Sequence, residues 1–148
     1  MLTKIDIMHA VYDKIKSIYP DYEVYLDDTK RNFETPCFFL KLISIRTQEK
    51  ERICYNDCTL YISYIPQEDD PAVSVIEVRD KIDNAFWRGF QVKDRFIHMT
   101  SISHQTVGED SDIVEMSLSF AYYDADAEDD KDVVMMEHVY DDISIEKG

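Results

Sequence analysis

Glycine is scarce in this chain, with only three among 148 residues, at positions 89, 108 and 148. A dinucleotide-binding fingerprint needs three glycines within six residues, and a P-loop needs two that frame a Lys-Ser/Thr pair. Both phosphate-binding motifs are therefore excluded. Cysteine is equally scarce: three residues, an odd number, do not make a disulfide framework and favour a protein kept in a reducing cytoplasm.

Positive charge is also in short supply, because 16 basic residues stand against 31 acidic ones and give a formal net charge of −15. A nucleic-acid reader depends on Lys and Arg to neutralise phosphates, so the composition argues against one. No apolar run approaches the roughly 20 residues of a membrane span. Lys4 and Asp6 interrupt the apolar residues of the N-terminus, so we expect no signal-peptide core and no membrane association.

The negative charge is unevenly distributed along the chain. Residues 124–148 hold ten acids and two lysines, a net charge of −8. The length fits one domain, and we expect a single domain over residues 1–124, with its compact part ending near Tyr123, and an acidic C-terminal extension over 125–148. An apolar island at 133–140 lies within the extension. It either folds back on the domain or docks on another chain.

Two segments have helical periodicity. Residues 3–19 predict an amphipathic helix that Thr3 caps together with Asp6 and that Pro20 ends. Its apolar stripe is predicted to consist of Ile5, Met8, Val11, Tyr12, Ile15, Ile18 and Tyr19. Asp70 and Pro71 predict the start of a second helix, and Gly89 its left-handed C-terminal residue.

The remaining segments have strand patterns. Short strands are expected at 23–26 and 90–92, and longer ones at 95–106 and 113–123. The apolar run 37–45 predicts a central strand with both faces at least partly covered, joined by a charged hairpin connection, 46–52, to an alternating strand at 53–65. This order predicts an α+β fold: a mostly antiparallel (mixed) sheet of five to six strands with two helices packed on it.

Few residues have the setting that catalysis needs. His98 and His104 lie about 20 Å apart along one predicted strand, too far to share a metal. The run starting at Asp124 imitates a calcium loop but has Asp129 where the loop needs glycine, and Met135 where it needs glutamate. We therefore predict no enzyme, no catalytic residues, no metal and no cofactor.

Four stretches together resemble one known family, the tail terminator or tail completion proteins of long-tailed phages and of phage-tail-like particles of Gram-positive bacteria. They are the N-terminal helix leading through Tyr19-Pro20 to Val24-Tyr25, the run Thr35–Leu42, the turn Val92–Arg95, and the closing strand Val114–Asp124. Their order and spacing carry the resemblance, which covers most of residues 1–124.

The resemblance implies a structural protein that forms a homohexameric ring on the head-proximal end of the tail tube. Such a ring stops tube polymerisation and offers the head–tail connector a joining surface, while DNA passes through without specific binding. The expected partners are therefore other copies of the chain, the tail tube protein and the connector protein. The expected location is the virion tail or a tail-like particle, assembled in the cytoplasm of the bacterial host.

Loops on a rigid sheet usually carry binding, which suggests contact residues in the charged loops and in the C-terminal island. The candidate subunit or tube contacts are Arg46, Glu49, Lys50, Arg52, Lys30, Arg31, Val133, Met135, Met136 and Tyr140. The surplus of acids supports an alternative function, an acidic DNA mimic that inhibits a basic nucleic-acid enzyme. Such a mimic needs carboxylates laid out along a folded surface.

Overall fold

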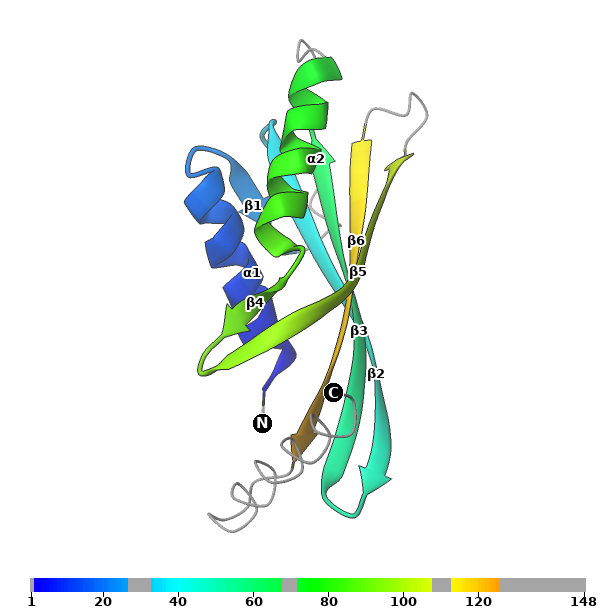
Figure 1. Ribbon diagram of the computed structural model, residues 1–148. Helices are drawn as coiled ribbons and strands as arrows, with labels where there is room; N and C mark the ends of the chain where they lie inside the picture. Colours follow the sequence, from blue (N-terminus) through cyan, green and yellow to red (C-terminus); the bar gives the residue numbers. More distant parts are fainter. Residues whose placement is uncertain (1, 27–32, 68–71, 108–112, 126–148) are drawn as a thin grey trace.

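The computed structural model describes residues 2–26, 33–67, 72–107 and 113–125, which form a single sheet with two helices on one face (Figure 1). The helices are α1 (Lys4–Ile18) and α2 (Ala72–Phe86). The strands are β1 (Glu23–Tyr25), β2 (Cys37–Lys50), β3 (Ile53–Ile65), β4 (Gly89–Val92), β5 (Arg95–Val107) and β6 (Ile113–Ala125). The predicted α+β class is confirmed.

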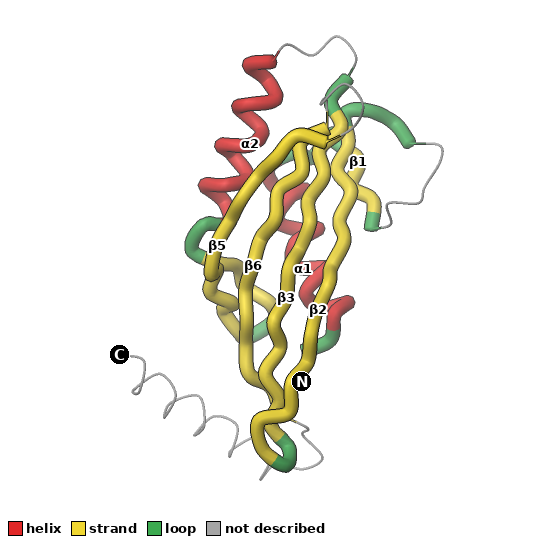
Figure 2. Tube along the Cα trace, turned by 90° about the vertical axis from the view of Figure 1, so that its right-hand side faces the viewer, coloured by secondary structure: helices red, strands yellow, loops and turns green. Residues whose placement is uncertain are grey.

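The six strands lie in the order β1-β2-β3-β6-β5-β4. All pairings are antiparallel except that of β1 with β2, so the sheet is mixed. Strands β3 and β6 form the centre, and their inward residues alternate with outward ones: Cys58, Leu60, Ile62 and Tyr64 on β3 are buried, as predicted. Figure 2 shows the sheet with both helices behind it.

Helix α1 begins as the sequence predicts. The Thr3 hydroxyl accepts a hydrogen bond from the Asp6 backbone N–H at 3.1 Å, and the Asp6 carboxylate accepts one from the Thr3 N–H at 2.9 Å. These bonds lower the pKa of Asp6 from its ordinary value, because they favour the ionised carboxylate. The ionised Asp6 carboxylate therefore stabilises the fold fully above the ordinary pKa of aspartate. This stabilisation is lost as the pH falls through the lowered pKa of Asp6.

Replacing Thr3 by alanine should lower the free energy of unfolding by about 1 kcal/mol, because the side-chain acceptor of the first turn is lost. Urea titration followed by circular dichroism measures the change. Thr3→Ser keeps the hydroxyl and should retain most of the stability. Equal losses for the two variants would contradict a capping role.

The predicted stripe of α1 is confirmed except at its start: Val11 and Ile15 are buried, and Met8, Tyr12, Ile18 and Tyr19 pack against the core. Ile5 is 66% exposed, whereas Ile7 is fully buried and shares its face with Val11 and Ile15. Both stripes have residues at three- and four-residue steps, so periodicity alone does not separate them. The position of the sheet beneath the helix selects the one that contains Ile7.

Strand β2 is covered on both faces only at its start. Residues 37–40 are buried, but from Lys41 onward the strand is exposed or half-buried. Phe39 lies on the face opposite the helices, where Tyr25 and Phe33 cover it with ring centroids 5.1 and 5.3 Å away. The expectation that both faces are at least partly covered is therefore confirmed for residues 37–40, but beyond Leu40 it is wrong for the face that carries Ile43 and Ile45.

Two further predicted boundaries change. Gly89 opens β4 with a φ of +138°, opposite His98, rather than closing α2 in the left-handed helical conformation. Strand β6 continues two residues past Tyr123, and both Asp124 and Ala125 are buried. The expected first residues of α2, Asp70 and Pro71, lie outside the described residues.

Candidate assembly surface

The sheet face opposite the helices is uncovered by any described helix (Figure 2). Hydrogen-bonded register places its residues in rows that cross β2, β3, β6 and β5. Two of these rows are Lys41, Tyr61, Ser117 and Ser103, and Ile43, Thr59, Ser119 and Ser101. Five of the eight residues in these two rows have short hydroxyl side chains. We call this surface the open face.

A shallow hollow and an apolar margin lie on the open face. The hollow has a volume of about 290 Å³ and is lined by Phe39, Lys41, Ile43, Tyr61, Ser63 and Glu115. Two isoleucines of β2 point outward beside it, Ile43 at 47% and Ile45 at 65% exposure. A shallow hollow beside exposed branched aliphatic residues fits a protein partner better than a small ligand, which binds in deep concave sites.

The same strand has a free hydrogen-bonding edge. Strand β1 pairs only with residues 37–39 of β2, so within the described ranges no strand lies along the outer edge of β2 from Leu42 to Lys50. On the other side of the sheet, β4 pairs with residues 95–98 of β5, and the Met99 N–H donates a hydrogen bond to the Arg88 carbonyl, so among the described residues this edge has no neighbouring strand only beyond Met99. Unpaired edges are templates for association with another chain.

The hairpin end of β2 and β3 holds four of the predicted contact residues, but not in a loop. Arg46, Glu49 and Lys50 belong to β2, and only Arg52 lies in the turn. The prediction of a connection over 46–52 is therefore wrong. A register shift between Gln48 and Lys50 accommodates the extra residue of this charged strand end.

These hairpin residues surround an open hollow of about 560 Å³. Its walls are Arg46, Gln48, Lys50, Glu51, Arg52, Ile53 and Cys54. Arg46 Nε donates a hydrogen bond to Asn56 Oδ1 at 2.9 Å, and Asn56 is itself buried, which holds this guanidinium at the wall. The other six predicted contacts, Lys30, Arg31, Val133, Met135, Met136 and Tyr140, lie outside the described residues.

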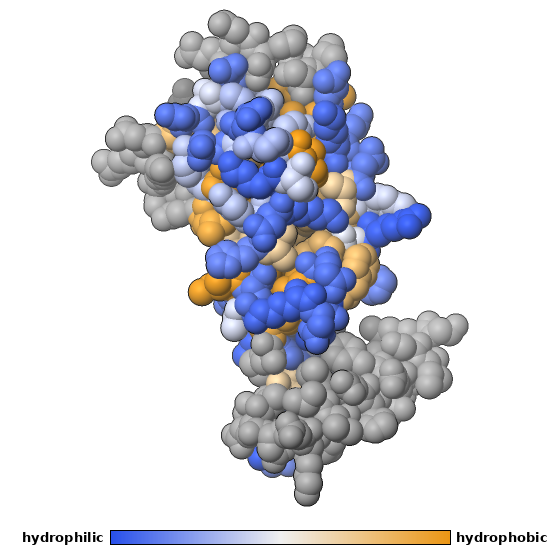
Figure 3. All heavy atoms as spheres, turned by 90° about the vertical axis from the view of Figure 1, so that its left-hand side faces the viewer, coloured by the Kyte–Doolittle hydropathy of each residue, from blue (hydrophilic) through white to orange (hydrophobic). Residues whose placement is uncertain are grey.

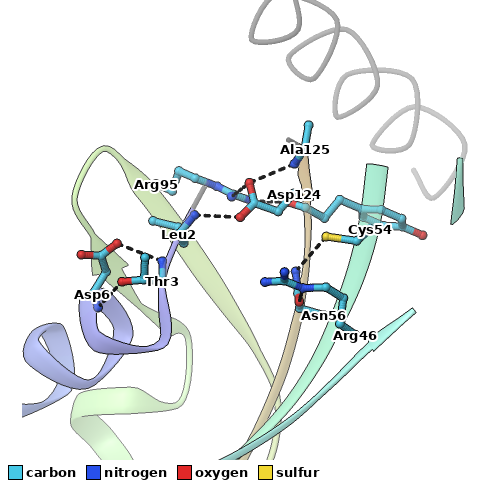
Figure 4. A network of polar contacts seen from close by, with 10 residues as sticks. Leu2, Thr3, Asp6, Arg46, Cys54, Asn56, Arg95, Asp124 and Ala125 are labelled. Atoms are coloured by element: carbon cyan, nitrogen blue, oxygen red, sulfur yellow. Dashed lines mark hydrogen bonds and ion pairs between the residues drawn. The ribbon is translucent and has the colours of Figure 1, made fainter. Parts of the chain in front are cut away.

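A buried ionic contact joins three distant parts of the chain (Figure 4). The Asp124 carboxylate, fully buried, lies 3.5 Å from Arg95 Nη1 and accepts hydrogen bonds from the backbone N–H of Leu2 at 2.7 Å and of Ala125 at 3.0 Å. Arg95 Nη2 donates to the Tyr123 carbonyl at 2.7 Å. We call this arrangement the Arg95–Asp124 anchor. It ties the chain before α1 to the start of β5 and the end of β6.

The sequence did not reveal the anchor, because Asp124 is the first residue of an acidic run and was interpreted as one of its solvent-exposed acids. A usable signal existed: Asp124 continues the alternation of Phe120 and Tyr122, which both face the helices. Burial lowers the pKa of Arg95, and the neighbouring Asp124 charge opposes that shift. The anchor therefore fixes where β6 ends and the chain continues toward residue 126.

Groups with nucleophilic or metal-binding chemistry are separated or buried. Burial raises the pKa of the Cys37 and Cys58 thiols to about 11, so both are protonated at neutral pH. Exposed His98 packs against Phe96, and exposed His104 contacts Arg79. Within residues 2–26, 33–67, 72–107 and 113–125, no three His, Cys, Asp or Glu side chains are placed to share a metal ion.

Figure 3 shows the molecule from the side that carries α1. Seen from the side of α1, the surface is mainly hydrophilic, and its hydrophobic residues lie in small separate patches (Figure 3). Neither of the helices in the described part of the chain is long and apolar enough to cross a membrane.

Comparison with known proteins places this architecture in a family. A family model described as phage tail terminator protein matches residues 6–132. No curated protein matches the chain. One solved structure is similar at 14% sequence identity and a TM-score of 0.48, over 88% of this chain and 100% of the other. Because the family model spans most of the sequence, from α1 to beyond the end of β6, the chain belongs to the phage tail terminator family.

Proposed function

We propose that this phage tail structural protein forms a homohexameric ring on the head-proximal end of the tail tube. The ring matches the tube on one side and so ends its polymerisation, and it presents a different surface to the head–tail connector on the other. Membership of a family of structural tail proteins supports the tail role. The observation that carries the ring is the open face, bordered by free edges on β2 and β5.

A closed ring needs a heterologous interface, in which one patch of a subunit contacts a different patch of the next. The two free edges belong to opposite sides of the sheet, so they are different patches of the kind that such an interface requires. The exposed Ile43 and Ile45 lie next to the β2 edge and supply apolar area. If the β2 edge of one subunit pairs with the β5 edge of the next, the sheet continues from subunit to subunit and the backbone hydrogen-bonding groups of both edges gain partners.

The net charge of −15 agrees with a conduit for DNA. A surface of like charge repels phosphates and does not retain the strand that passes through it. We propose that the ring assembles in the cytoplasm of the bacterial host, joins the tube protein and the connector protein, and remains in the virion tail. No step of this function forms or breaks a covalent bond.

The test compares the double variant Ile43→Asp/Ile45→Asp with the natural chain by native mass spectrometry and negative-stain imaging. The natural chain should form rings with a mass near six times 17.5 kDa. The variant should remain monomeric, because two carboxylates at the margin must be desolvated in the interface. Ile5→Asp is the matched control: Ile5 is equally exposed but lies on the helix side, so rings should persist.

Circular dichroism should show that both variants are folded. A natural chain that stays monomeric at high concentration would contradict the ring, and one that binds a basic nucleic-acid enzyme would favour the DNA-mimic alternative. Rings that form with the double variant but not with Ile5→Asp would instead move the interface to the helix side.

A further inference from the structure

The hollow at the hairpin end is a cationic site in an acidic protein. Arg46, Lys50 and Arg52 line it against a single carboxylate, that of Glu51, with Glu49 the other acid of the hairpin end. Arg46 is held at the wall by its hydrogen bond to buried Asn56. Three cations around one concave surface favour an anionic occupant.

The described chain ends beside this hollow. Strand β6 runs antiparallel to β3, and its last residue, Ala125, pairs with Ile53, which is itself part of the hollow's wall. Neighbouring strands lie about 4.8 Å apart. The chain beyond Ala125 therefore leaves the sheet next to the turn between β2 and β3. The Arg95–Asp124 anchor fixes this exit point.

The next seven residues have the complementary charge. Residues 126–132 contain five carboxylates and one lysine, a net charge of −4. Seven residues span at most about 25 Å, so the stretch is long enough to reach across the hollow from Ala125. Covalent attachment also gives it a high effective concentration there, and charges within about 10 Å of each other interact appreciably at 0.1 M salt.

We propose that the acidic stretch 126–132 binds in the hairpin hollow of its own chain, with its carboxylates paired to Arg46, Lys50 and Arg52. The hollow is thus a binding site for an acidic peptide, and the peptide that it binds is a segment of the same chain. This contact directs the apolar island 133–140 to the hairpin end of the sheet. The inference rests on the charged residues of the hairpin and on the pairing of Ala125 with Ile53. It does not require that the protein forms a ring.

Zero-length carbodiimide crosslinking tests the contact in the full-length chain. An equal mixture of ¹⁴N- and ¹⁵N-labelled protein is treated at low salt, and the crosslinked peptides are identified by mass spectrometry. The expected product joins Lys50 Nζ to a carboxylate of 126–132 within one isotope label. Its yield should fall about fivefold in 0.5 M salt, where the screening length is only a few ångströms.

Charge reversal provides the second measurement. Arg46→Glu/Arg52→Glu should reduce the Lys50 product about fivefold or more, because repulsion replaces attraction at the hollow. Arg52→Glu alone, at an exposed turn residue, repeats the test if the double variant does not fold. Lys41 lies on the open face of the same strand, so Lys41→Glu should leave the Lys50 product unchanged.

Three outcomes would overturn the proposal. Products that carry both isotope labels would show that a neighbouring copy supplies the acidic stretch. Lys50 products confined to Glu49 or Glu51 would show that the stretch lies elsewhere. Equal crosslinking yields of Lys41 and Lys50 with residues 126–132 would show that the acidic stretch contacts lysines without preference for the hollow.

Discussion

Replacing Gly89 by valine should destabilise the protein by about 4 kcal/mol or more. The backbone at Gly89 has a φ of +138°, a region that a β-branched residue adopts only with strain. A Cβ at this position would lie 2.0 Å from the carbonyl oxygen of Ile97, which is backbone and cannot move aside without breaking the pairing of β4 with β5. Chemical denaturation measures the loss.

Gln91→Val is the matched control in the same strand. Gln91 is exposed and two residues from Gly89; valine favours strand conformation but removes the exposed hydrogen bond from Gln91 Nε2 to the Lys93 carbonyl, so the loss should stay within about 1 kcal/mol. If Gly89→Val unfolded at nearly the same denaturant concentration as the control, the close approach of β4 and β5 at Ile97 would be incorrect.

Replacing Asp124 by asparagine should cost about 3 kcal/mol of unfolding free energy. The substitution keeps the size of the side chain but leaves the Arg95 guanidinium, whose side chain is only 19% exposed, without its counter-charge. It also places an amide group where the carboxylate accepts hydrogen bonds from the N–H groups of Leu2 and Ala125. The melting temperature should fall by roughly 10 °C.

Two comparisons isolate the anchor. Asp94→Asn removes an exposed carboxylate next to Arg95 in sequence and should change the stability by less than about 0.5 kcal/mol. The double variant Asp124→Asn/Arg95→Met removes both charges and keeps a side-chain oxygen that can accept a hydrogen bond from the N–H of Leu2 or Ala125, so it should recover part of the loss. Equal stability of Asp124→Asn and Asp94→Asn would contradict the anchor.

Local signals predicted the elements of this fold well. The capping box of Thr3 and Asp6 involves residues three apart, and the alternation of β3 needs only its own side chains, so each is readable from a short window. Charge was a poorer guide. The hairpin end around Arg46 and Lys50 was interpreted as a loop because it is polar on both faces, which an exposed strand end also tolerates.

The candidate assembly surface was less accessible to prediction. Ile43 and Ile45 were interpreted as part of a covered strand, because an apolar run does not reveal how far its neighbours extend. On this face Tyr25 and Phe33 pack on Phe39, whereas Ile43 and Ile45 farther along the strand are exposed. The remaining predicted contacts, such as Lys30 and Met135, stay predictions because they lie outside the described residues.

Sequence alone determined the class of fold, the order of helices and strands, the charge that argues against nucleic-acid recognition, and the resemblance to tail terminators. These properties depend on composition and on periodicities of two and of 3.6 residues, which are local. The tertiary structure decided which sheet face is left open, why Gly89 is needed, and that Asp124 is buried against Arg95. Those outcomes depend on contacts such as that between Leu2 and Asp124, 122 residues apart, which no short window of sequence contains.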